Sequence, residues 1–227
     1  YGFHEEADYS VKNIHYSDEF VEFDLLHQNQ LVEHFATTLV GEHNILNILA
    51  ATITARNIGL GFAEIKEGVK TFRGVKRRLE VIGVVGDIVV IDDFAHHPTA
   101  IEQTVLACKK RYKDRRLWLI FEPRTNTTRR NIFQKELIEA MALGDISIMA
   151  EVFKLDAIAE GERLSVDAVI AGIIEKNRQA HYIPNIDEIV DFVQKESRQG
   201  DVVLIMSNGC FGGIYQKLLD ALKIRWS

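Results

Sequence analysis

Apolar and polar residues alternate over most of the first 40 positions, a pattern typical of strands that bury one face. The alternating segments are 7–16, 19–26 and 31–40, and they are rich in β-branched and aromatic residues. Three strands are therefore predicted here. From Asn44 the apolar residues recur every three to four positions, which indicates a helix ending near residues 59–61, and a second helix is predicted over 63–72.

Short apolar runs and helical patterns follow one another in the rest of the chain. Two apolar runs flank Gly86 and Asp87 and predict a β-hairpin, and Pro98 opens a helix with one apolar face. Further strands are predicted at 117–121, 146–149, 180–183 and 202–206, and further helices at 129–143, 165–178, 186–197 and 213–223. Because strand and helix alternate, the predicted fold class is α/β, with a mostly parallel sheet covered by helices on both faces.

The change of pattern near residues 71–78 predicts a joint between two domains, 1–75 and 76–227. With 227 residues, of which 47% are hydrophobic, the chain is long enough for one large domain or two small ones. It begins at Tyr1, without a methionine, and enters a strand pattern almost at once. We therefore expect it to be a piece of a longer protein.

The net charge and the cysteine content limit the binding partners and the cellular location that can be expected. The formal net charge of −6 and the pI near 5.8 argue against a nucleic-acid binder, although local arginines can still bind phosphates or carboxylates. Cys108 and Cys210 are far apart and form no CxxC motif, so no disulfide framework or thiolate zinc site is expected, and a reducing, cytoplasmic location is predicted. No apolar run reaches about 18 residues and no signal-peptide pattern is present, so no membrane partner is expected.

Three polar or glycine-rich loops follow predicted strands: "DDFAHHP" at 92–98, "EPRTNTTRR" at 122–130 and "SNGCFGG" at 207–213. In a parallel α/β sheet the loops that leave the carboxyl ends of the strands share one edge, and ligands bind there. We therefore expect these three loops to lie together and to form the functional site.

The first loop places two acids and two histidines directly before a proline. One interpretation is structural: Pro98 suits the first turn of a helix, His97 caps that helix, and the acids are solvated at the strand end. A metal site is not predicted, because adjacent histidines project differently and no further histidine or cysteine stands nearby at ligand spacing. The third interpretation is a nucleotide or substrate role, in which Asp93 accepts both hydroxyls of a ribose.

The second loop carries groups that suit anion binding. Its arginines offer planar guanidinium groups that pair with carboxylates, and it leads into a helix N-terminus. The residues concerned are Arg124, Asn126, Thr127, Thr128, Arg129 and Arg130. A solvated basic loop without a ligand is the alternative.

The third loop and the start of the first helix each allow two interpretations. The backbone N–H groups of 207–213 can cradle an anion, or the glycines can serve only a tight turn. In "GEHNILN", Asn44 and Asn47 share a helix face with His43 nearby, and an asparagine amide complements the N6/N7 edge of adenine. The alternative is that Asn44 caps the helix and Asn47 is simply exposed.

Five segments in this order, "GEHNILNILAA", "FRGVKRRLE", "IDDFAHHPTAI", "FEPRTNTTRR" and "MSNGCFGGI", resemble the Mur ligases, the ATP-dependent amide-forming enzymes of bacterial cell-wall precursor synthesis. The resemblance extends over essentially the whole chain. It implies that 1–75 is the C-terminal part of the central ATPase domain and that 76–227 is the C-terminal, Rossmann-like, peptide-binding domain. The family's UDP-sugar domain and P-loop are not represented, so the fragment alone is expected to be inactive.

The resemblance also implies roles for individual residues. The adenine of ATP is expected at His43, Asn44 and Asn47, and the ATP phosphate and ribose at Arg78 and Asp93. His96 and His97 are expected near the reacting centre, as catalytic residues. Peptide carboxylates are expected at Arg124, Asn126, Thr127 and Arg129, with Ser207, Asn208 and Gly209 lining the same edge. Cys210 stands where the family pattern has glycine, so the expected binding of an anion by the backbone N–H groups of this loop is in doubt.

In this family, ATP with Mg²⁺ activates the lactyl carboxylate of UDP-N-acetylmuramate as an acyl phosphate, which an amine then attacks. The resemblance is greater to members that add the murein tripeptide L-Ala-γ-D-Glu-meso-diaminopimelate than to those that add L-alanine, whose pattern Phe94 and "EPRTNTTRR" do not follow. An L-alanine-adding ligase is the alternative of the same class. A non-catalytic nucleotide-binding module or a Rossmann oxidoreductase is the alternative of a different class, but no GxGxxG stands on a first strand. A metal-dependent hydrolase would need zinc at residues 92–97.

Overall fold

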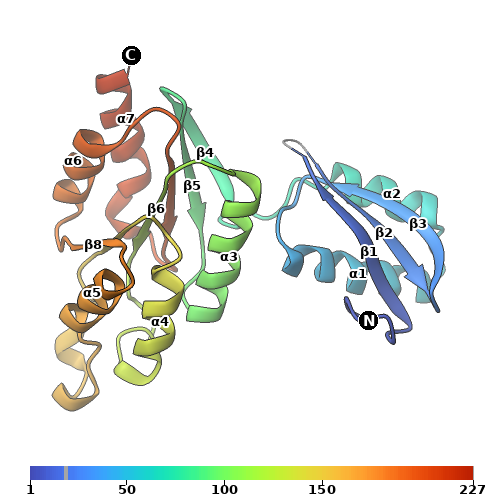
Figure 1. The fold of residues 1–227 in the computed structure, drawn as a ribbon, viewed down its shortest axis with the longest axis horizontal. Helices are drawn as coiled ribbons and strands as arrows, with labels where there is room; N and C mark the ends of the chain where they lie inside the picture. Colours follow the sequence, from blue (N-terminus) through green and yellow to red (C-terminus); the bar gives the residue numbers. More distant parts are fainter. Residues whose placement is uncertain (18–19, 227) are drawn as a thin grey trace. The chain divides into compact units, whose positions relative to one another are not determined.

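The computed structural model describes residues 1–17 and 20–226, and it divides into two compact units, Tyr1–Val75 and Lys76–Ser227 (Figure 1). Each unit has its own sheet and its own buried core. Within the described residues, no helix combines the length and the apolar character needed to cross a lipid bilayer.

The first unit is an antiparallel sheet followed by two helices. The strands are β1 (Tyr9–Tyr16), β2 (Val21–His27) and β3 (Gln30–Thr37), in the order β1-β2-β3, and the helices are α1 (Glu42–Asn57) and α2 (Phe62–Thr71). These elements match the predicted ones within a few residues, and residue 19, where one predicted strand begins, lies outside the described part. Phe23 and Phe35 stack in the core with ring centroids 5.6 Å apart.

The second unit is built on a six-stranded sheet with the order β4-β5-β9-β6-β7-β8. Its strands are β4 (Glu80–Val85), β5 (Ile88–Asp93), β6 (Leu117–Phe121), β7 (Ile146–Met149), β8 (Gln179–Tyr182) and β9 (Val202–Met206). β4 and β5 form the predicted antiparallel hairpin, and the remaining neighbours in the sheet are parallel. The predicted α/β class with a mostly parallel sheet is confirmed.

Helices cover both faces of this sheet. On one face lie α3 (Pro98–Arg111), α4 (Gln134–Met141) and α5 (Val166–Glu175), and on the other α6 (Ile186–Glu196) and α7 (Ile214–Trp226). Successive residues of β6 alternate between the two cores, with Leu119 and Phe121 on the α3 side and Trp118 and Ile120 on the α7 side. Because both faces are buried, the strand is a continuous apolar run.

One predicted helix, 129–143, is shorter than expected. α4 begins only at Gln134, after a short 3₁₀ turn at Asn131–Phe133. Upstream, the hydroxyls of Thr125 and Thr128 lie 2.8 Å apart, and each accepts the backbone N–H of the other residue. These local bonds offer the backbone an alternative to the helix, so the helix starts further along the chain.

The turn of the β4–β5 hairpin packs against the end of α7. Gly86 and Asp87 have φ values of 55° and 60°, as in a type I′ turn. A Cβ atom at Gly86 would lie 2.5 Å from the Cβ of Trp226. The backbone conformation and the close contact therefore both require glycine at this position.

Replacing Gly86 by alanine is expected to lower the free energy of unfolding by about 1–3 kcal/mol, because the left-handed backbone and Trp226 both oppose a methyl group. Gly161→Ala is the matched control, since a Cβ there would meet nothing within 4 Å. Urea denaturation of the two variants measures the difference. Equal stabilities would contradict the role assigned to Gly86.

Candidate functional site

The three polar loops leave the second unit's sheet side by side, as predicted. β9 lies between β5 and β6, and its last residue, Met206, pairs with Asp93 on one side and with Phe121 on the other. The loops that follow these residues therefore start at the same level, at the carboxyl ends of parallel strands. Ligands bind at this edge in open α/β sheets.

Ser207, the first residue of the third loop, joins all three loops. It is fully buried, and its N–H donates to the carbonyl of Asp93, 3.2 Å away. Its hydroxyl donates to the Glu122 carboxylate in the second loop and accepts the N–H of Gly209 at 2.9 Å. Its carbonyl accepts a bond from the guanidinium of Arg77. Each polar atom of Ser207 thus has a partner within the protein.

Asp93 organises the first loop from the inside. It is only 3% exposed, and its carboxylate accepts N–H bonds from Leu79 and Ala95, both at 2.7 Å, and an O–H bond from Thr104 at 3.3 Å. Burial raises the pKa of Asp93, and these donors oppose the rise. The carboxylate therefore ties the start of β4 to the loop that precedes α3.

Arg77, which the sequence patterns do not single out, connects the first loop, the third loop and α7. Its guanidinium donates to Asp92 and to the Tyr215 hydroxyl, both at 3.2 Å, and to the carbonyl of Ser207. Its backbone carbonyl accepts the N–H of Phe94 at 2.8 Å. Burial raises the pKa of Asp92, and the positive charge of Arg77 opposes that rise. Arg77 is thus a structural residue of the site.

The ring of Phe94 brings Arg78 and His96 together. The guanidinium carbon of Arg78 lies 5.4 Å from the ring centroid, and the His96 ring meets Phe94 edge-on at 5.2 Å. The Nδ1 atom of His96 is 2.9 Å from the carbonyl oxygen of Phe94. Because a carbonyl only accepts, Nδ1 carries the proton, and Nε2 is the basic nitrogen of the neutral ring. The Arg78 guanidinium and the His96 imidazole therefore both contact the ring of Phe94.

His97 is the N-cap of α3. Its Nδ1 accepts the N–H of Thr99 at 3.4 Å, Pro98 occupies the first turn, and its ring packs against Phe133 with centroids 4.9 Å apart. The predicted helix cap is confirmed, but the acids that the same interpretation placed in solvent are buried, with Asp92 6% and Asp93 3% exposed. Any catalytic role of this residue would have to use the Nε2 side of the ring.

Arg124, in the second loop, is held between packed neighbours. Its guanidinium carbon lies 3.9 Å from the centroid of the Phe153 ring, and Nη1 is 3.4 Å from the Glu122 carboxylate. A Cβ atom on Gly209 would fall 2.7 Å from the Nε atom of Arg124, so the Arg124 side chain would have to shift if residue 209 were not glycine. The Arg124 side chain keeps 30% of its surface exposed. It is therefore fixed in position but still open to a ligand.

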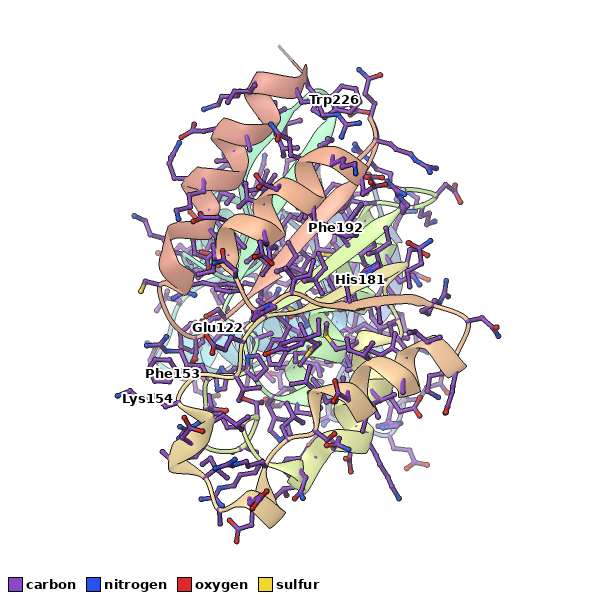
Figure 2. The ribbon with its side chains drawn as sticks, turned by 90° about the vertical axis from the view of Figure 1, so that its left-hand side faces the viewer. Glu122, Phe153, Lys154, His181, Phe192 and Trp226 are labelled. Carbon is purple, nitrogen blue, oxygen red and sulfur yellow. The ribbon has the colours of Figure 1, made fainter. Side chains whose placement is uncertain are left out.

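Arg129 binds the protein itself. Its guanidinium donates to the Asn126 side chain and to the carbonyls of Phe153 and Lys154, the last two at 3.2 and 3.3 Å. Glu122, Phe153 and Lys154 follow one another along this edge of the unit (Figure 2). Sequence reasoning missed residues 153 and 154, because no motif or periodicity marks them.

Three residues expected to bind ligands also make bonds that hold the loops together. Ser207 and Asp93 are buried with their polar atoms paired, and Arg129 is occupied by backbone carbonyls. These residues position the loops, and the expected ribose contact of Asp93 would require its carboxylate to exchange partners. Among the residues expected to bind the peptide, Arg124, Asn126, Thr127, Arg129, Asn208 and Gly209 keep exposed or partly exposed surface. The buried Oδ1 of Asn208 has no hydrogen-bond partner among the described residues.

The asparagines of α1 form a short chain of contacts in the first unit. Gly41, and not Asn44, is the N-cap of this helix. The Nδ2 atom of Asn44 donates to the Val40 carbonyl at 2.8 Å, and Nδ2 of Asn47 lies 3.5 Å from Oδ1 of Asn44. Asn47 is exposed, whereas His43 and Asn44 are partly buried. The adenine prediction therefore depends chiefly on the Asn47 amide.

Two protein-family models match the chain. The model of the Mur ligase middle domain matches residues 1–55, and the model described as Mur ligase, glutamate ligase domain, matches residues 77–209. The chain belongs to the Mur ligase family.

Relatives of this Mur ligase chain carry two kinds of name. A UDP-N-acetylmuramate–L-alanyl-gamma-D-glutamyl-meso-2,6-diaminoheptandioate ligase of Escherichia coli is 36% identical over 203 residues, 88% of the chain and 42% of the relative. A UDP-N-acetylmuramate–L-alanine ligase of Syntrophus aciditrophicus is 30% identical over 226 residues, 98% of the chain and 46% of the relative. The crystal structure of a murein peptide ligase from Psychrobacter arcticus is 33% identical, with a TM-score of 0.67 over 96% of this chain and 45% of that one. The chain spans about half the length of the curated relatives it matches.

The acids and histidines of the first loop do not form a metal-ligand set in this Mur ligase chain. Asp93 is surrounded by N–H and O–H donors, and His97 caps a helix. Across residues 1–17 and 20–226, no group of three or more His, Cys, Asp or Glu side chains is placed to hold a metal ion.

Ser207→Ala is expected to lower the free energy of unfolding by about 2–4 kcal/mol, because it removes the hydroxyl that donates to the buried Glu122 carboxylate and accepts the Gly209 N–H. Cys210→Ala, in the same loop at an exposed position, is the control and should change stability by less than about 0.5 kcal/mol. Urea denaturation checks both values. A Ser207 variant as stable as the Cys210 variant would contradict the linking role.

Proposed function

We propose that this chain is part of a Mur ligase that joins UDP-N-acetylmuramate to the murein tripeptide L-Ala-γ-D-Glu-meso-diaminopimelate at the expense of ATP. The observation that carries the proposal is Arg124, packed against Phe153 and the backbone of Gly209 at the ligand-binding edge. A guanidinium held in this way pairs with carboxylates in a defined orientation. The tripeptide-adding relative at 36% identity and the murein peptide ligase at 33% support this substrate.

The chemistry of the tripeptide suits this edge. The γ-linked D-Glu keeps one free carboxylate and diaminopimelate brings two more, whereas L-alanine has only one. Taking an unpaired carboxylate out of water is costly, so a peptide rich in carboxylates needs several fixed donors. Arg124 is proposed to bind one of these carboxylates, with the amide of Asn126 and the hydroxyl of Thr127 as neighbouring donors.

The proposed reaction has two steps. A lactyl carboxylate oxygen attacks the γ-phosphorus of ATP, which forms the acyl phosphate and releases ADP. Mg²⁺, when bound, would offset the negative charge of the phosphates. The amine of the peptide then attacks the acyl carbon, phosphate leaves, and the amine loses a proton as the amide forms. His96 is proposed to accept this proton at Nε2, because its Nδ1 proton is bound to Phe94. Arg78 is proposed to stabilise the phosphate charge.

The nucleotide contacts of the first unit belong to the same proposal. The amide of Asn47 presents a donor and an acceptor, which match the N6/N7 edge of adenine. Asn44 is proposed to orient that amide through their 3.5 Å contact while it is itself anchored to Val40. His43 is proposed as the third residue on the adenine.

The substrate is tested with the complete ligase that contains this chain, given ATP, UDP-N-acetylmuramate and equal amounts of tripeptide and L-alanine. Mass spectrometry of the nucleotide products is expected to detect the tripeptide adduct and little of the alanine adduct. An L-alanine-adding ligase is the second candidate, and the 30% identity of the relative with that name over 98% of the chain favours it. Predominance of the alanine adduct would refute the proposal in favour of this candidate.

Arg124→Ala in the complete ligase is expected to raise the KM for the tripeptide roughly 10- to 100-fold, because a charge-assisted pair with a carboxylate is lost. The KM for ATP should stay within about twofold, since Arg124 is not among the residues proposed to bind nucleotide. Arg130→Ala is the matched control in the same loop, because Arg130 pairs with Glu162 instead. Steady-state kinetics that cannot distinguish the two variants would contradict the role of Arg124.

A further inference from the structure

Residues 153 and 154, which follow β7, are hydrogen-bonded to the second loop, 122–130, although no sequence pattern predicted this contact. The N–H of Phe153 donates to the carbonyl of Pro123 at 3.0 Å. The guanidinium of Arg129 donates to the carbonyls of Phe153 and Lys154. Residues 153 and 154 are therefore held in place by the same loop that carries Arg124.

Lys154 has an unusual backbone conformation for a residue with a side chain. Its φ and ψ are 48° and 49°, in the left-handed region, which is strained for a residue that carries a Cβ atom. The carbonyl of Lys154 accepts bonds from Arg129 at 3.3 Å and from the N–H of Ala157 at 3.1 Å, and these bonds hold the conformation. The direction in which the Lys154 side chain leaves the backbone is thus set by its surroundings.

Two cations contact the same aromatic ring. The guanidinium carbon of Arg124 is 3.9 Å from the Phe153 centroid, and the ammonium nitrogen of Lys154 is 5.2 Å from it. The nearby Glu122 carboxylate is already bound to the hydroxyl of Ser207. Among the described residues, no carboxylate forms an ion pair with Lys154. Two positive charges therefore meet at one ring in a chain whose net charge is −6.

The strand order shows which end of a bound peptide would meet Lys154. His96 follows β5, Arg124 follows β6 and Lys154 follows β7, and the sheet order is β5-β9-β6-β7. Lys154 thus lies on the side of Arg124 that faces away from His96. If the peptide amine reacts near His96, its far end extends past Arg124 toward Lys154.

We propose that Lys154 determines specificity for the peptide by binding the carboxylate at the far end of its third residue. Arg124 binds a carboxylate nearer the reacting amine, and Phe153 positions both cations. The site would accordingly select acidic peptides with a carboxylate at the distal end of the third side chain. This inference rests on the proposed function, because it concerns the same peptide-binding edge.

The test compares two peptides that differ by one carboxylate: L-Ala-γ-D-Glu-meso-diaminopimelate and L-Ala-γ-D-Glu-L-lysine. The complete ligase is expected to prefer the first through a lower KM. Lys154→Met should raise the KM for the diaminopimelate peptide roughly 10-fold and leave that for the lysine peptide within about twofold, because only the first offers the distal carboxylate. Lys154→Arg, which keeps the charge, should retain most of the preference.

Lys195→Met, an exposed lysine on α6, is the matched control and should behave as the unmodified enzyme. A Lys154→Met enzyme that keeps the full preference, or that loses activity equally with both peptides, would overturn the inference. Failure of the unmodified enzyme to form any tripeptide adduct would instead overturn the proposed function. The two failures are therefore distinguishable.

Discussion

The buried hydrogen bonds of Ser207 are the constraint on which the candidate site depends. One residue with no exposed surface uses its N–H, its carbonyl and its hydroxyl to join the first loop, Arg77 and Glu122. Each of these bonds adds only about 1 kcal/mol, but a buried group that loses its partner costs about 1–3 kcal/mol. The three loops can therefore hardly move independently of one another.

The arginines of the site divide into those that build it and those that face a ligand. Arg77 and Arg129 donate to carbonyls and side chains of neighbouring loops. Arg124 keeps exposed surface, and its position depends on the loops that the other two arginines hold. A binding group that is ordered before its ligand arrives loses less entropy on binding. This division explains why a basic loop can be well ordered without being fully neutralised by the protein's own acids.

Much of the fold could be predicted from local patterns, and the shared edge of the three loops followed from the strand and helix order. The turn at Gly86 and Asp87 could be predicted because both residues tolerate positive φ. The inward orientation of Ser207 and Asp93 could not be predicted, because it depends on partners far away in the sequence, such as Glu122 for Ser207 and Leu79 for Asp93. For the same reason the sequence did not predict that Phe153 and Lys154 belong to the site, because their partner Arg129 lies 24 and 25 residues away in the chain. Local propensity predicts elements, whereas these contacts are set by how the elements pack.

The edge around Arg124 is proposed to receive the carboxylates of a peptide. A crystal structure of this chain with L-Ala-γ-D-Glu-meso-diaminopimelate bound would test this proposal. We expect a peptide carboxylate within about 3 Å of the Arg124 guanidinium, with the third residue extending along the β7 side of the edge. A bound peptide whose carboxylates contact other parts of the chain, with Arg124 still paired only with Glu122, would contradict it.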